Sequence, residues 1–112
     1  VSGFSMGLVY GLGGYGMKVS KVSEHFPFLT QLLTRFCTSS IPDKSFTYSS
    51  LQINFNYAAR RHVDGNNLGP SYIISLGEHT GGQLWTAGQG VIDCHKTWKK
   101  FMGTEEHDML SQ

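Results

Sequence analysis

The clearest pattern of hydrophobic and polar positions lies between residues 46 and 57. Apolar and polar side chains alternate there, with Leu51, Ile53 and Phe55 on one side and Gln52, Asn54 and Asn56 on the other. Such alternation predicts a β-strand with one apolar and one polar face. The sequence leaves open whether the polar face meets water or lines a polar pocket.

A second pattern predicts a helix that begins near Ser23 and ends between Cys37 and Ser40. Its apolar residues recur at the spacing of one helical face: Phe26, Leu29, Leu32, Leu33 and Phe36. Ser23 is the predicted N-cap, and Pro27 is tolerated in a first turn. We expect the apolar face to be core, because a small domain needs a helix to cover its sheet.

Short apolar segments separated by glycine-containing turns follow, and they predict further strands. These segments are residues 71–76, 83–86, 91–94 and 98–101. Their spacing is typical of an antiparallel sandwich or barrel. We therefore expect a mainly β fold with one or two helices. A chain of 112 residues has room for one domain, with residues 1–45 supporting a core formed by residues 46–112.

The glycine-rich start of the chain contains a G-x-G-x-x-G match at Gly11, Gly13 and Gly16. A dinucleotide site needs this motif between a strand and a helix, with an acidic residue about 20 positions further on. Pro27 interrupts the next segment and Asp43 lies too far away, so we expect only a short strand and a glycine turn.

Composition excludes several classes of protein. Hydrophobic residues make up 39% of the chain and charged residues 15%, which is typical of a folded globular protein, and the net charge of +1 gives no general attraction to nucleic acid. The cysteines, Cys37 and Cys94, lack C-x-x-C spacing, which favours a reducing, intracellular compartment. No apolar run approaches the length of a membrane span, so we expect no membrane partner.

The predicted strand leads into a His-x-Asp pair, His62 and Asp64. In extended backbone, side chains two residues apart point to the same face. A second histidine would complete a 2-His-1-carboxylate facial triad, a set of ligands that suits Fe(II) and leaves coordination positions open. An isolated His-x-Asp pair also occurs in ordinary polar turns.

His107 is the best candidate for the third ligand, because it lies several elements downstream and precedes Met109 and Leu110, which favour another strand. His79 lies in a glycine turn close to the first pair. His95 with Cys94 is an alternative as part of a zinc site, although Cys37 would be the only remaining thiol ligand.

These residues resemble the Fe(II)/2-oxoglutarate-dependent oxygenases. The resemblance covers residues 47–107 and rests on four features in order: His62-Val-Asp64, the strand SYIISL, the Gly-Gly-x-Leu turn ending at Leu84, and an aromatic residue, Phe101, shortly before Gly-x-x-x-His ending at His107. The lead-in to His62 is similar to prolyl-hydroxylase-like members. The block from Asn56 to Asn67 is similar to the nucleobase-oxidising branch, which acts on thymine or 5-methylcytosine in DNA.

The resemblance implies a fold and a set of roles. The fold would be a double-stranded β-helix, a jelly roll of the cupin type, lacking its last strand. His62, Asp64 and His107 would hold Fe(II), with 2-oxoglutarate and O2 as co-substrates. Asn54 and Tyr57 would bind 2-oxoglutarate. The macromolecular substrate would be a protein side chain or a DNA base, with Asn67 and Arg60 as candidate contacts. From the residues alone, Asn67 is more typical of a left-handed turn, and Arg60 of a solvated basic rim that could also meet phosphates.

The chain departs from the family after His107. Relatives place an Arg about eight or more positions beyond this histidine to clamp the far carboxylate of 2-oxoglutarate, whereas this sequence ends at Gln112. We expect a C-terminally truncated oxygenase domain, or a substitute cation from Arg60, Arg61 or Lys99. The alternative is a non-catalytic β-barrel binding module of the same ancestry.

Overall fold

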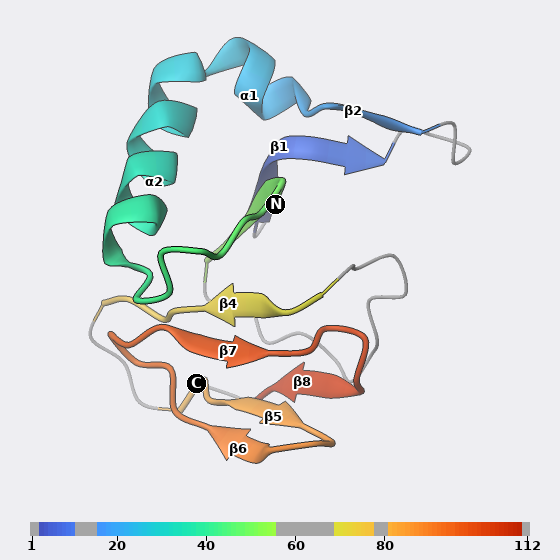
Figure 1. Ribbon diagram of the computed structural model, residues 1–112, viewed down its shortest axis with the longest axis vertical. Coiled ribbons are helices and arrows are strands. Elements are labelled where there is room, and N and C mark those ends of the chain that lie inside the picture. Colours follow the sequence, from blue (N-terminus) through green and yellow to red (C-terminus); the bar gives the residue numbers. More distant parts are fainter. Residues whose placement is uncertain (1–2, 11–15, 56–68, 78–80, 111–112) are drawn as a thin grey trace. The chain divides into compact units, whose positions relative to one another are not determined.

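The computed structural model describes residues 3–10, 16–55, 69–77 and 81–110 (Figure 1). Contacts divide the chain into two compact units, Val1–Phe55 and Asn56–Gln112. Within the described ranges, the protein is mainly β, with antiparallel sheets and two helices. The predicted mainly β class is therefore confirmed. The boundary between the units lies after Phe55 instead of residue 45, because the strand at residues 50–54 pairs inside the first unit.

The first unit contains a three-stranded sheet of order β2-β1-β3. Strand β1 (Gly3–Tyr10) lies in the centre and pairs antiparallel with β2 (Met17–Val19) and β3 (Ser50–Asn54). Strand β3 confirms the strand predicted from alternation, although it is shorter than predicted. The antiparallel pairing of β1 with β2 differs from a dinucleotide-binding motif, which requires parallel strands joined by a helix.

The two faces of this sheet differ as the alternation predicts. Met6 on β1 is buried, and it lies opposite Leu51 on β3. On the polar face, Gln52 and Asn54 are exposed, and the Gln52 amide donates to Asn54 Oδ1 at 3.0 Å. The Ser5 hydroxyl donates to the other end of the same Gln52 amide. The polar residues therefore form a hydrogen-bonded row along the sheet surface.

The predicted helix is divided in two at Phe26. Helix α1 (Lys21–His25) ends there, and α2 (Pro27–Ser40) begins, because Phe26 has non-helical dihedral angles of φ −129° and ψ 63°. Ser20 is the N-cap of α1, with its hydroxyl accepting the Ser23 N–H at 3.1 Å. Ser23 was the predicted cap; its hydroxyl instead accepts the Gly7 N–H from β1 at 2.8 Å. Pro27 occupies the first turn of α2, as expected.

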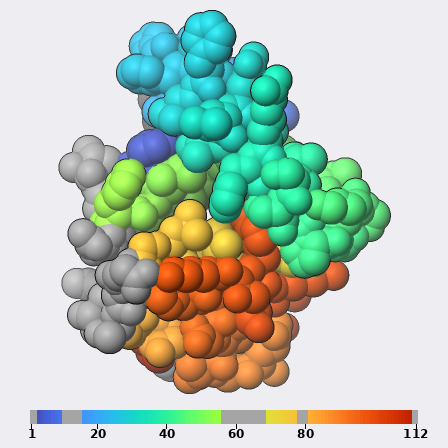
Figure 2. Space-filling view, turned by 90° about the vertical axis from the view of Figure 1, so that its left-hand side faces the viewer, coloured from blue at the N-terminus to red at the C-terminus, as the bar shows by residue number. Residues whose placement is uncertain are grey.

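The prediction that the apolar face of α2 is core was wrong. Of the five residues predicted to form this face, only Leu33 is half-buried. The other four are exposed: Phe26, Leu29, Leu32 and Phe36. Figure 2 shows side chains of this helix standing at the surface. A different face of α2 makes polar contacts inside the first unit: the Tyr48 hydroxyl donates to the Thr34 carbonyl at 3.3 Å and lies 3.2 Å from the Thr38 hydroxyl.

Gly7 in β1 provides a test of this sheet. Its φ is +90°, and an added Cβ would lie 2.3 Å from the Ser49 carbonyl oxygen. Gly16 has a similar φ of +83° but open space around it. We expect Gly16→Ala to cost about 1–2 kcal/mol, the cost of a left-handed backbone. Gly7→Ala should cost on the order of 3 kcal/mol or more, because the backbone oxygen cannot rotate away.

Urea unfolding followed by far-UV circular dichroism measures both variants against the parent chain. Equal losses in the two variants would show that the close approach of Ser49 to Gly7 contributes nothing.

The second unit contains five short strands within its described residues. They are β4 (Ser71–Ile73), β5 (Leu84–Thr86), β6 (Gly90–Ile92), β7 (Lys99–Phe101) and β8 (His107–Met109). Strand β4 pairs with β7, while β5 lies between β6 and β8; all of these pairs are antiparallel. The predicted segments 71–76, 83–86 and 98–101 each contain a shorter strand, and β6 overlaps the predicted segment 91–94 but begins one residue before it.

The core of the second unit lies along β5 and β7. Leu84, Cys94 and Phe101 are buried, together with the Thr86 side chain, which is fully buried. Trp85 on β5 and Trp98 before β7 are half-buried. Both tryptophans of the chain therefore belong to the second unit.

Candidate metal centre

His107 is the one predicted iron ligand among the described residues, and Asn54 and Lys99 are the described candidates for co-substrate binding. The other predicted site residues lie outside the described ranges: His62, Asp64, Tyr57, Arg60 and Asn67. His107 belongs to the second unit and Asn54 to the first. Their predicted roles remain predictions.

His107 is the first residue of β8 and lies opposite Thr86 of β5 in the strand register. Its side chain is 5% exposed. The ring of Phe101 meets the imidazole edge-to-face, with ring centroids 5.4 Å apart and an interplanar angle of 64°. A strand, a neighbouring strand and an aromatic ring thus fix the position of the imidazole.

The hydrogen bond of His107 fixes its chemical form. Nδ1 lies 2.7 Å from the backbone carbonyl oxygen of Glu105. A carbonyl can only accept, so Nδ1–H is the donor and, in the neutral ring, Nε2 carries the lone pair. Metal-binding histidines commonly make this bond with the nitrogen that does not bind the metal. His107 is therefore held in the form that can bind a metal through Nε2.

His95 is held in the opposite form. Its Nε2 lies 2.6 Å from the carbonyl oxygen of Gly77, so Nε2–H is the donor there. Burial raises the pKa of the neighbouring Cys94 thiol, which disfavours the thiolate that zinc requires. Among the described residues, His95 and Cys94 gather with no third His, Cys, Asp or Glu side chain, which argues against the zinc site considered for them.

Within residues 3–10, 16–55, 69–77 and 81–110, no three His, Cys, Asp or Glu side chains gather in a way that could hold a metal ion. Two of the three predicted ligands, His62 and Asp64, fall outside these ranges. The described part of the candidate centre is therefore one ligand and the groups that hold it.

The turn between β5 and β6, residues 87–89, is hydrogen-bonded to the two residues that precede His107. The Ala87 N–H donates to the Glu106 carbonyl at 2.9 Å, and the Gly88 N–H donates to the Glu105 carboxylate at 3.1 Å. The next amide, Gln89 N–H, donates to the Thr86 hydroxyl at 2.9 Å. Three successive backbone amides are thus satisfied. No local pattern in the sequence marks Glu105, because its partner Gly88 lies 17 residues away.

Asn54 is exposed at the end of β3, and its side-chain oxygen accepts the hydrogen bond from Gln52. The amide group of Asn54 is therefore oriented by a neighbour on the same strand. An exposed amide with a fixed orientation is compatible with the predicted contact to 2-oxoglutarate.

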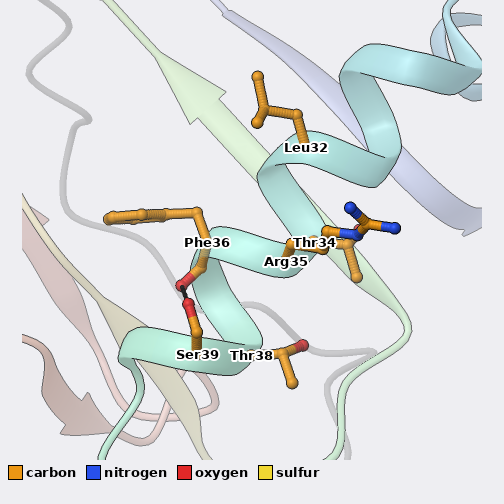
Figure 3. Close-up of a pocket in the computed structure, with 6 residues that line it drawn as sticks. All are labelled: Leu32, Thr34, Arg35, Phe36, Thr38 and Ser39. Carbon is orange, nitrogen blue, oxygen red and sulfur yellow. Dashed lines mark hydrogen bonds between the residues drawn. The ribbon is translucent and has the colours of Figure 1, made fainter.

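A separate hollow of about 580 Å³ lies along α2 (Figure 3). Its lining residues all come from this helix: Leu32, Thr34, Arg35, Phe36, Thr38 and Ser39. The Ser39 hydroxyl donates to the Phe36 carbonyl at 3.2 Å, so it is engaged in the helix itself. These described lining residues include no carboxylate, imidazole or thiol, and so they offer neither metal ligands nor an acid–base pair.

No family model, curated protein or solved structure matches the chain. No helix among the described residues is both long and apolar enough to cross a membrane.

Proposed function

We propose that this chain is part of an Fe(II)- and 2-oxoglutarate-dependent dioxygenase that hydroxylates a C–H bond of a protein side chain or a nucleobase. The observation that carries the proposal is the buried His107 at the start of β8, with Nδ1 donating to a carbonyl and Nε2 in the form that binds metal. The sequence places this histidine downstream of a His-x-Asp pair, in the order that the oxygenase family uses.

The strand pairing of the second unit supports the finer proposal of a jelly roll. Strands β5 and β6 form a hairpin in one sheet, and the flanking strands, β4 and β7, pair with each other in another. Strand β8 then returns to pair with β5. Rolling up a long hairpin produces such nested pairs in two sheets, as in a double-stranded β-helix.

The chemistry of the proposed donor set fits Fe(II). Two imidazoles and one carboxylate, from His62, His107 and Asp64, form a facial triad that leaves positions for further ligands. When bound, iron with 2-oxoglutarate and O2 would supply the oxidation of the C–H bond. The ring of Phe101 contacts the His107 ring edge-to-face, and because Nδ1–H donates to the Glu105 carbonyl, Nε2 would be the nitrogen that binds the metal.

Other residues are assigned roles in binding. Asn54 and Tyr57 would hydrogen-bond 2-oxoglutarate, while Arg60 and Asn67 would contact the macromolecular substrate. Lys99, which is exposed on β7, is a candidate cation for the far carboxylate of the co-substrate, together with Arg60 and Arg61.

An anaerobic titration of the full chain with Fe(II), with and without 2-oxoglutarate, tests the proposal. We expect one Fe(II) to bind per chain and succinate to form when air is admitted, with no succinate in the absence of Fe(II). Failure to bind Fe(II) would refute the proposal. Iron binding without succinate, from this chain and from a version extended beyond Gln112, would instead identify a non-catalytic binding module.

A further inference from the structure

The turn at residues 87–89 and the segment just before His107 are joined by hydrogen bonds from both residues of the Glu105–Glu106 pair. Glu106 contributes its backbone carbonyl, whereas Glu105 contributes its carboxylate. The backbone carbonyl of the same Glu105 accepts the Nδ1–H of His107. One residue therefore connects the turn to the imidazole, through its side chain on one side and its main chain on the other.

We propose that Glu105 is a positioning residue for His107: its carboxylate, by binding the Gly88 amide, orients its own carbonyl and so keeps the His107 proton on Nδ1. A hydrogen bond to an imidazole selects the tautomer only if the acceptor stays in place. Two hydrogen bonds hold Glu105 in place. Its backbone N–H donates to the Met102 carbonyl at 3.0 Å, and its side-chain carboxylate accepts the Gly88 N–H. The inference about the tautomer stands on this geometry alone, and its consequence for iron rests on the proposed function.

The close approach of Gly88 to Glu105 gives an independent way to disturb the contact. A Cβ at position 88 would lie 2.3 Å from Oε2 of Glu105. The atom it meets is the end of a flexible side chain, so Gly88→Ala should displace the carboxylate at little other cost. The variant changes neither Glu105 nor His107.

Three variants and one control separate positioning from general stability. Glu105→Ala removes the carboxylate, Gly88→Ala displaces it, and Glu105→Gln keeps an oxygen that can accept the Gly88 N–H. Glu106→Gln is the matched control, because it removes one negative charge from the adjacent exposed residue and keeps the backbone carbonyl that binds the turn.

Nitrogen-15 NMR of the metal-free chain, at a pH where the ring is neutral, reports the proton position on His107. We expect the parent chain, Glu105→Gln and Glu106→Gln to show Nδ1–H. Glu105→Ala and Gly88→Ala should show a mixture with Nε2–H. In the Glu105→Ala background, Gly88→Ala should cause no further change, because no carboxylate remains to be displaced.

Anaerobic Fe(II) titration gives the second readout, with roughly 10-fold weaker binding expected for Glu105→Ala and Gly88→Ala, as for the loss of other outer hydrogen bonds around metal ligands. Unchanged ring shifts in both variants would overturn the inference, as would an effect of Gly88→Ala that persists without Glu105. The predicted tautomer shifts in a parent chain that binds no Fe(II) would uphold the positioning role and refute the proposed function.

Discussion

Replacing His107 with alanine should weaken Fe(II) binding by about 100-fold or more, since loss of outer hydrogen-bond partners of metal ligands already costs roughly 10- to 100-fold. His107 is the described member of the proposed facial triad, and in its tautomer Nε2 is the nitrogen that would bind the metal. Anaerobic Fe(II) titration measures the loss. Uncoupled succinate formation should disappear in the same variant.

The control for this experiment is His25→Ala. His25 ends α1 in the first unit and is exposed, so its removal should leave iron affinity unchanged. Because His107 is buried against Phe101, circular dichroism must show that His107→Ala is folded; His107→Gln, which keeps a polar group of similar reach, is the second variant. Iron affinity that survives both substitutions unchanged would refute the ligand assignment.

Leu84→Ala should destabilise the second unit by about 2–5 kcal/mol, the range for large-to-small substitutions in a packed core. Leu84 is 1% exposed and lies on the central strand β5, opposite Ile92 on one side and Met109 on the other. Removing its side chain leaves a void on one face of the sheet, beside the side chains of Ile92 and Met109. Natural domains have a total stability of about 5–15 kcal/mol, so this loss would be a large share.

Val91→Ala on β6 is the matched control for Leu84→Ala. Val91 is 61% exposed, and we expect a loss below about 1 kcal/mol, the span of strand propensities. Urea titration followed by the native amide resonances of β5 and β8 compares the two variants. Similar losses at both positions would show that β5 is not the centre of this core.

Alternation and turn residues predicted most of the strands because both are local properties of the chain. Ser71–Ile73, Leu84–Thr86 and Lys99–Phe101 lie inside the predicted segments. The orientation of α2 could not be predicted in this way. Its apolar spacing has a helical period, but the period alone does not say that Thr34 and Thr38 contact Tyr48 while Leu32 stays exposed.

The candidate site was also predictable only in part, because some of its contacts depend on how distant segments meet in the folded chain. His107 was selected from its distance along the chain and from the apolar residues that follow it, and the structure gives it burial and a suitable tautomer. The Glu105 contact to Gly88 could not be predicted, because it depends on how two turns approach in space. Sequence also cannot distinguish His95 from His107 by tautomer, since each form is set by a backbone carbonyl brought close by folding.

The location of Trp85 and Trp98 makes tryptophan fluorescence, excited selectively, a reporter of the second unit alone, because the first unit contains no tryptophan. Far-UV circular dichroism near the helical bands reports mainly on the first unit, which contains α1 and α2. Denaturation curves from the two signals would coincide if the units unfold together and separate if they unfold independently. Comparing the two curves therefore measures how cooperatively the two units unfold.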